Sequence, residues 1–119
     1  MMDQPSMREL VEAVRDFLEQ KAMPELQGHT AFHARVAANA LSIVVRELEQ
    51  GPQSAKDELV RLQKLLGHNG TLEDLNRELC KRIRDGIFTL DTLGLGEHLT
   101  ITTREKVAID QPSYSGLKR

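Results

Sequence analysis

The chain has 119 residues, of which 39% are hydrophobic and 29% are charged, and its net charge is −2. A soluble globular protein of this length can bury a core without a metal or a disulfide, and because only 3% of its residues are aromatic, Leu, Val, Ile and Ala must build that core. The weak negative charge and the scarce aromatic rings exclude a basic surface or stacking platform, so nucleic acid is not an expected partner.

The first predicted helix begins at Ser6. Ser6 and Glu9 have the spacing of a capping box, and apolar residues follow at helical spacing. These apolar residues are Met7, Leu10, Val11, Val14, Phe17 and Leu18. Pro24 and Gly28 are expected to separate this helix from the next one.

Two helices are predicted between residues 30 and 67. The first runs over about 30–50 and is expected to end at Gly51 and Pro52, because proline disrupts a helix interior. The second runs over about 54–67. Its apolar positions are Leu59, Leu62, Leu65 and Leu66.

A fourth helix is predicted between Thr71 and Gly86. Thr71 and Asp74 have the spacing of a second capping box, and Gly86 is a typical helix terminator. The residues predicted on its inner face are Leu72, Leu75, Leu79 and Ile83.

After Gly86 the hydrophobic pattern has no clean period. We expect a loop, although residues 87–90 resemble a short strand, and then a last helix over about 97–109. Residues 111–119 are expected to form an extended tail after an ordered core of about 6–110. Because short loops force neighbouring helices to run antiparallel, the sequence predicts an all-α single domain over 1–119, a four- or five-helix antiparallel bundle.

The polar residues of the predicted second helix are candidates for a functional site. On a wheel of about 100° per residue, Arg35 and Asn39 fall on a narrow solvent-facing stripe, whereas His33 lies near the middle of a wide apolar arc. A buried imidazole needs a hydrogen-bond partner. We therefore expect His33 to be a core histidine bonded to the preceding loop, or else a histidine that lines a ligand pocket.

No complete catalytic or metal-binding motif is present in the sequence. His29 and His33 have the H-x-x-x-H spacing but lack the glutamate of the HExxH peptidases, and no Asp or Glu lies three residues before a histidine, as di-iron bundles require. The P-loop, nucleophile-elbow and acyl-carrier motifs are also missing. We expect no metal, no cofactor and no enzymatic activity.

Cys80 is the only cysteine, which is typical of a protein in a reducing compartment. It falls on or beside the apolar face of the predicted fourth helix, so we expect a small buried hydrophobic residue rather than a nucleophile. The N-terminus lacks the pattern of a secretory signal, and the longest mostly apolar run, 37–45, is too short to cross a membrane. These features predict a cytoplasmic protein without a membrane span.

Three stretches, AFHARVAANALSIVVRELEQGP, LEDLNRELCKRIRDG and TTREKVAIDQPSY, resemble a family of small bacterial helical domains of unknown function. Its members are encoded beside or fused to aminoglycoside-phosphotransferase-like kinases and occur near acyl-CoA dehydrogenases. The resemblance extends from about Leu10 to Tyr114 and departs at Gln111, where the pattern prefers asparagine. The matching residues are Phe32, His33, Arg35, Val36, Asn39, Leu41, Leu75, Asn76, Leu79, Cys80, Ile83, Lys106, Ile109, Asp110 and Pro112.

The resemblance brings no catalytic residues but implies a partner enzyme. The favoured hypothesis is a non-catalytic accessory module that binds or positions a kinase-like or acyl-CoA-dehydrogenase-like partner and can form a homodimer. The alternative is a small-ligand-binding, even enzymatic, helical domain with a polar cleft around His33. The polar residues proposed for such a cleft are His33, Arg35, Asn39, Asn76, Arg82 and Asp110. Without a ligand, most of these residues would form a buried network that fixes helix register.

Overall fold

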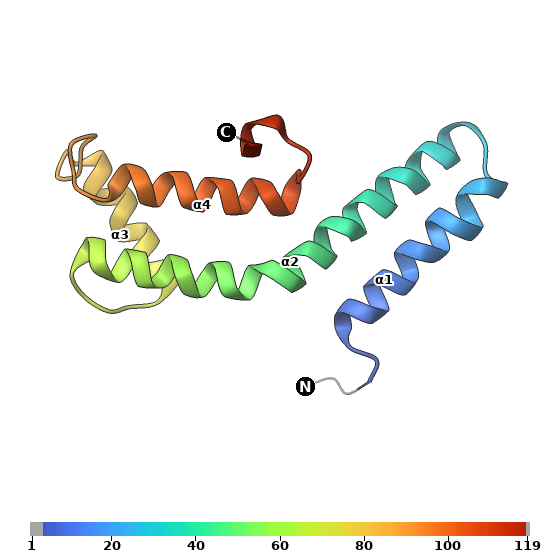
Figure 1. Ribbon diagram of the computed structural model, residues 1–119, viewed down its shortest axis with the longest axis horizontal. Coiled ribbons are helices and arrows are strands. Elements are labelled where there is room, and N and C mark those ends of the chain that lie inside the picture. Colours follow the sequence, from blue (N-terminus) through green and yellow to red (C-terminus); the bar gives the residue numbers. More distant parts are fainter. Residues whose placement is uncertain (1–3, 119) are drawn as a thin grey trace. The chain divides into compact units, whose positions relative to one another are not determined.

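The computed structural model describes residues 4–118 and divides the chain into two compact units, Met1–Gly51 (unit 1) and Pro52–Arg119 (unit 2). Every regular element in the described residues is helical, which confirms the all-α class (Figure 1). The α-helices in this range are α1 (Met7–Phe17), α2 (Gly28–Leu66), α3 (Leu72–Arg84) and α4 (Leu95–Asp110). The antiparallel bundle and the single domain stay predictions.

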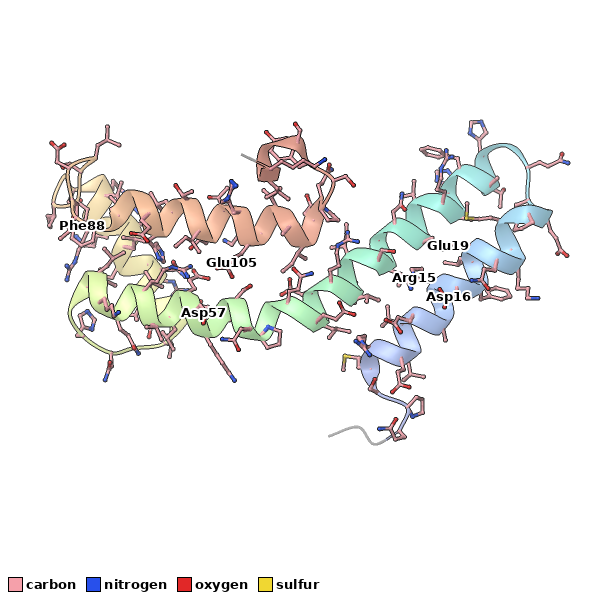
Figure 2. The ribbon with its side chains drawn as sticks, in the orientation of Figure 1. Arg15, Asp16, Glu19, Asp57, Phe88 and Glu105 are labelled. Carbon is pink, nitrogen blue, oxygen red and sulfur yellow. The ribbon has the colours of Figure 1, made fainter. Side chains whose placement is uncertain are left out.

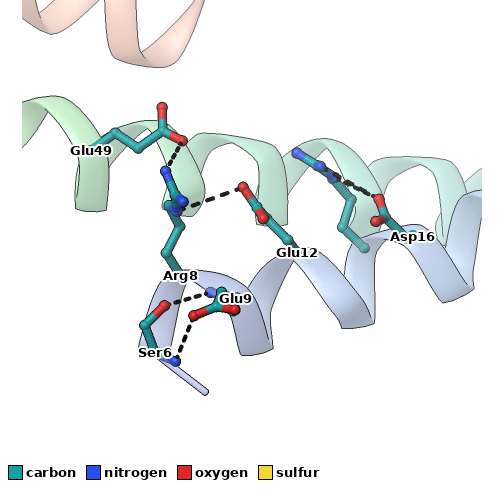
Figure 3. Close-up of polar contacts among 7 residues, drawn as sticks. Ser6, Arg8, Glu9, Glu12, Asp16 and Glu49 are labelled. Atoms are coloured by element: carbon teal, nitrogen blue, oxygen red, sulfur yellow. Dashed lines mark hydrogen bonds and ion pairs between the residues drawn. The ribbon is translucent and has the colours of Figure 1, made fainter. Parts of the chain in front are cut away.

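The start of α1 confirms the predicted capping box. Ser6 Oγ accepts a hydrogen bond from the Glu9 N–H at 3.1 Å, and Glu9 Oε1 accepts one from the Ser6 N–H at 3.1 Å (Figure 3). After Phe17 the chain continues in a π-helical turn, Leu18–Ala22, and a 3-10 turn, Met23–Glu25. The helical path therefore extends almost to the start of α2.

The predicted helix end at Gly51 and Pro52 is wrong, because α2 is one helix that runs through both units with Pro52 inside it. An internal proline removes one backbone hydrogen bond and costs about 3 kcal/mol in a helix interior. Val45 before Pro52 and Leu62 after it are both buried. Burial of apolar side chains on both sides of the proline offsets this local cost.

Unit 1 contains α1 and the first part of α2, and only a narrow strip of it is buried. Its buried side chains on α2 are Ala34, Ala38 and Val45, whereas α1 has none. Arg8 on α1 donates to Glu49 on α2 at 3.2 Å and lies 3.8 Å from Glu12 (Figure 3). The predicted apolar face of α1 is largely exposed, at Met7 (53%), Leu10 (43%), Val14 (53%) and Phe17 (58%).

Unit 2 holds a leucine core between three helices. The buried members are Leu62 and Leu66 from α2, Leu75 and Leu79 from α3, and Leu95 from α4. Leu59, Leu72 and Phe88 pack against this cluster. The inner faces predicted for the third and fourth helices are confirmed at these positions, but Ile83 is 41% exposed.

The boundaries of α3 and α4 depend on local backbone chemistry. Thr71 Oγ1 accepts from the Asp74 N–H at 3.1 Å, and Gly86, with φ 76°, follows the end of α3 as the sequence predicts. The loop predicted after Gly86 is confirmed, and α4 begins two residues earlier than expected. Its N-cap is Gly94, whose φ of 86° suits glycine because a Cβ is disfavoured there.

The expected extended tail is wrong for residues 111–118. Ser115–Lys118 forms a 3-10 turn that lies near α4 (Figure 1). Arg104 on α4 donates hydrogen bonds to the carbonyl oxygens of Gly116 at 3.3 Å and Leu117 at 3.0 Å. These bonds hold the tail against α4 within unit 2.

Candidate functional site

The predicted burial of His33 is wrong, because its side chain is exposed on α2. The imidazole meets the edge of the Phe32 ring, with centroids 5.6 Å apart and an interplanar angle of 67°. Arg35 places its guanidinium carbon 5.7 Å from the centroid of the same ring. Arg35 and Asn39 are both exposed. The apolar arc of α2 is therefore wider than the strip that is buried in unit 1.

The other predicted site residues lie in unit 2 and make separate contacts. Asn76 Nδ2 donates to Glu58 Oε2 at 3.0 Å, which ties α3 to α2. Arg82 pairs with Glu78 at 2.5 Å and lies 5.3 Å from the centroid of Phe88. Both side chains thus support helix packing. A common cleft of all six predicted residues stays a prediction.

Asp110 is the last residue of α4 and is exposed. Ile109, which precedes it and also matches the family pattern, is buried. Of the last two residues of α4, one therefore lies in the interior and the other at the surface. A role for Asp110 in ligand binding also stays a prediction.

A partly buried polar layer joins α2 and α4, and it is centred on Arg61. Its Nε donates to His98 Nδ1 at 3.1 Å, its Nη2 donates to Thr102 Oγ1 at 3.0 Å, and its Nη1 lies 3.6 Å from Glu105 Oε1. Figure 2 shows Glu105 on the side of α4 that faces the second part of α2. Each nitrogen of one planar guanidinium therefore meets a different residue of α4.

This layer was not predicted from the sequence, although a signal for it exists. The positions of α4 that turn inward are Leu95, His98, Thr102, Glu105 and Ile109. Their spacing of three and four residues is that of a buried helix stripe. The stripe is apolar at its two ends and polar in its middle, and a search for apolar periodicity does not detect such a pattern.

His98 is the buried titratable centre of the layer, with 2% of its surface exposed. Burial lowers the pKa of His98, and the nearby positive charge of Arg61 lowers it further, against a smaller opposite effect of Glu58. The neutral imidazole is therefore favoured. Because Arg61 can only donate, Nδ1 must accept, and the neutral ring carries its proton on Nε2.

A cavity of about 340 Å³ lies beside this layer, a size at the lower end of small-molecule sites. It lies between the second part of α2 and the start of α4. The residues that line it are Arg61, Lys64, Leu65, Leu93, Gly94, Glu97 and His98. The cavity combines two cationic side chains, the buried imidazole and two leucines, so we take it as the candidate ligand site of unit 2.

The comparison with known proteins is informative for one family. Residues 24–114 match the model of a domain of unknown function, DUF6285. The chain belongs to the DUF6285 family. The DUF6285 match includes the cavity and the Arg61 layer and begins after α1, later than the resemblance predicted from the sequence. No curated protein and no solved structure matches the chain.

The described residues of the DUF6285 chain contain neither a metal-binding cluster nor a membrane-spanning helix. No group of three or more His, Cys, Asp or Glu side chains within residues 4–118 is placed to hold a metal ion. No helix in the same range is both long and apolar enough to cross a membrane.

A second histidine, His68, has the opposite electrostatic environment to that of His98. Its Nδ1 lies 2.9 Å from the carbonyl oxygen of Asn69, and its Nε2 lies 2.8 Å from Glu78 Oε1. The Asn69 carbonyl, followed by Glu78, raises the pKa of His68. The His68 ring thereby links the loop after α2 to α3.

The predicted burial of Cys80 is wrong, because its thiol is exposed on α3. Cys80 follows the buried Leu79 by one residue, and one residue turns a helix by about 100°. We expect the thiol of the native protein to react fully with a water-soluble aromatic disulfide reagent, without denaturant. A thiol that reacts only after urea is added would contradict this exposure.

Proposed function

We propose that this chain is a non-catalytic accessory module that binds a helix of a partner protein. The docking surface is the α2 patch, which consists of Phe32, Arg35, Val36 and Asn39. The observation that carries the proposal is the exposure of large apolar side chains in the patch, 51% for Phe32 and 48% for Val36. Such surfaces lose unfavourable contact with water when a partner covers them.

The spacing of the α2 patch favours a helical partner. Its residues occupy positions i, i+3, i+4 and i+7, so they share one face over about 10 Å of helix. Aromatic and arginine side chains are enriched among residues that dominate binding energy. The ring of Phe32, with Arg35 above it, provides such a pair on an exposed helix.

The charge of the surrounding helix favours an acidic partner face. Residues 28–46 contain no Asp or Glu, and the exposed Arg35 of the α2 patch lies among them. A partner helix with apolar residues and flanking carboxylates would complement both the apolar and the cationic character of this region. The α2 patch lies inside the part of the chain that matches DUF6285.

The family resemblance suggests which proteins could carry that helix. It implies an aminoglycoside-phosphotransferase-like kinase or an acyl-CoA dehydrogenase, in a cytoplasmic bacterial setting. In this proposal the chain positions the enzyme and performs no chemistry, and its helices form the predicted antiparallel bundle. The alternative cleft around His33 has less support, because that imidazole is exposed on one helix.

Direct titration of purified proteins tests the accessory function. The full chain is titrated by calorimetry with a kinase-like enzyme and an acyl-CoA dehydrogenase from its own genome. We expect one of them to bind, and Arg35→Glu or Phe32→Ala to weaken binding by about tenfold or more. Arg84→Glu is the matched control, since Arg84 is also an exposed arginine and lies outside the α2 patch.

Two outcomes would overturn the proposal. One is that binding does not depend on the α2 patch, which is the result if neither enzyme binds or if Arg84→Glu weakens binding as much as Arg35→Glu does. The other is that the chain sediments as a dimer that Phe32→Ala dissociates, because the α2 patch would then be occupied by a second copy.

A further inference from the structure

The start of α4 lies at the cavity in unit 2, whose lining includes Gly94 and Glu97 but not Gly96. Its N-cap, Gly94, has no side chain that could accept from the first turn. The Leu95 N–H donates to the Thr92 carbonyl at 3.2 Å and the His98 N–H to the Gly94 carbonyl at 3.0 Å, but the Gly96 and Glu97 N–H groups have no acceptor within residues 4–118. Free N–H groups and the helix dipole together favour an anion at such a terminus.

A buried side chain provides a second, independent donor at the same cavity. His98 is 2% exposed and lines the cavity, and its Nδ1 is already occupied by Arg61. Its Nε2–H has no acceptor among the residues that the structure describes. Because Nε2 is not a fully buried unpaired atom, water or an acceptor atom inside the cavity can reach its N–H.

The charged groups around the cavity are nearly balanced. Lys64 is exposed and has no ion pair within the described part of the chain, while the charge of Arg61 is shared with Glu105. Glu97 also lines the cavity and opposes an anion. Binding must therefore depend on directed hydrogen bonds to a small group, and not on a strong positive field.

The remaining walls limit the size of the ligand. Leu65 and Leu93 add an apolar side to a space of about 340 Å³. A Cβ at Gly94 would lie 3.4 Å from Leu65, whereas the space around a Cβ at Gly96 is open. A side chain at position 94 would therefore contact Leu65, which also lines the cavity.

We infer that this cavity binds the oxyanion of a small molecule, a carboxylate or a phosphate group attached to a short apolar body. The oxyanion accepts hydrogen bonds from the Glu97 N–H group and from His98 Nε2, and Lys64 pairs with its charge. The leucines contact the apolar body. This site is in unit 2 and is independent of the α2 patch, so either proposal can stand without the other.

Nuclear magnetic resonance titration of the full chain tests this site. Inorganic phosphate and butyrate are added separately at pH 7, and the amide signal of Glu97 and the Nε2 signal of His98 are followed. We expect saturable shifts at these groups with at least one of the two anions. Saturation by phosphate alone, by butyrate alone or by both supports the site and identifies the oxyanion.

Two pairs of variants control the titration. Lys64→Met is expected to weaken binding by about threefold to tenfold, whereas Lys56→Met, at an exposed lysine of α2 outside the cavity lining, should leave it unchanged. Glu97→Pro removes the proposed backbone donor in the first helical turn, where proline is tolerated, and Glu97→Ala loses the same carboxylate but keeps that donor. Circular dichroism confirms that each variant is folded.

Linear shifts without saturation for both anions would overturn the inference. Equal losses of affinity in Lys64→Met and Lys56→Met would also overturn it, because the anion would then respond to general surface charge. Equal affinities of folded Glu97→Pro and Glu97→Ala would exclude the backbone donor and contradict the proposed geometry.

Discussion

Replacement of Leu62 by alanine is expected to lower the free energy of unfolding of unit 2 by about 2–5 kcal/mol. Leu62 is 0% exposed and belongs to a cluster to which α2, α3 and α4 all contribute. The helices cannot easily close around the lost volume, because the Asn76–Glu58 bond and the Arg61 layer hold their register. The cost therefore combines lost apolar burial with a residual cavity.

Urea denaturation and hydrogen exchange of α3 and α4 amides measure this effect in the full chain. Val60→Ala is the matched control, since Val60 lies on the same helix and is 52% exposed. Its effect should stay within about 0.5 kcal/mol. Similar losses in Leu62→Ala and Val60→Ala would show that the leucine cluster does not form the core of unit 2.

The helix starts were predictable because their causes are local. The capping box of Ser6 and the hydroxyl cap of Thr71 depend on residues only three positions apart, and both bonds form as predicted. The continuity of α2 depends instead on contacts far along the chain. At Pro52 the local rule predicts an end, and burial of residues on either side outweighs it.

The site residues were harder to predict because a helical wheel shows the apolar arc but not what covers it. His33 lies within that arc and is nevertheless exposed, since the buried strip of unit 1 is limited to Ala34, Ala38 and Val45. His98 is the opposite case. Its burial depends on Arg61, 37 positions earlier in the chain, and no local pattern identifies that partner.

The two partnered histidines of unit 2 make stability respond to pH in opposite directions. The pKa of His68 is raised in the folded state, so its contribution is present below about pH 6.5 and is lost as pH rises through the raised value. The pKa of His98 is lowered, so its contribution is present above about pH 6.5 and is lost as pH falls towards the folded value.

Replacement of Arg61 by methionine is expected to lower the free energy of unfolding by about 2–3 kcal/mol at pH 7.5. The substitution removes the donors to His98 and Thr102 and the cation opposite Glu105, and it leaves these groups in a partly buried layer. Arg84→Met is the control, because Arg84 is exposed on α3. Its effect should stay within about 0.5 kcal/mol.

The same variant is expected to reduce the loss of stability between pH 7.5 and pH 5.5. In the wild type the unfolded chain protonates His98 before the folded chain does, so acid favours unfolding. Without the positive charge of Arg61 the pKa of His98 rises towards its ordinary value, although burial still lowers it. The folded and unfolded chains then differ less in the number of protons that they bind. The free energy of unfolding therefore changes less steeply with pH.

Urea titrations of the wild type, Arg61→Met and Arg84→Met at several pH values in this range measure the slope. His68 is unchanged in all three proteins, so its opposite contribution cancels in the differences. Carboxyl groups ordinarily have a pKa near 4, below the range from pH 5.5 to pH 7.5, so they contribute little to the slope. A slope for Arg61→Met equal to that of the wild type would mean that burial alone controls the protonation of His98, with no part played by the Arg61 charge.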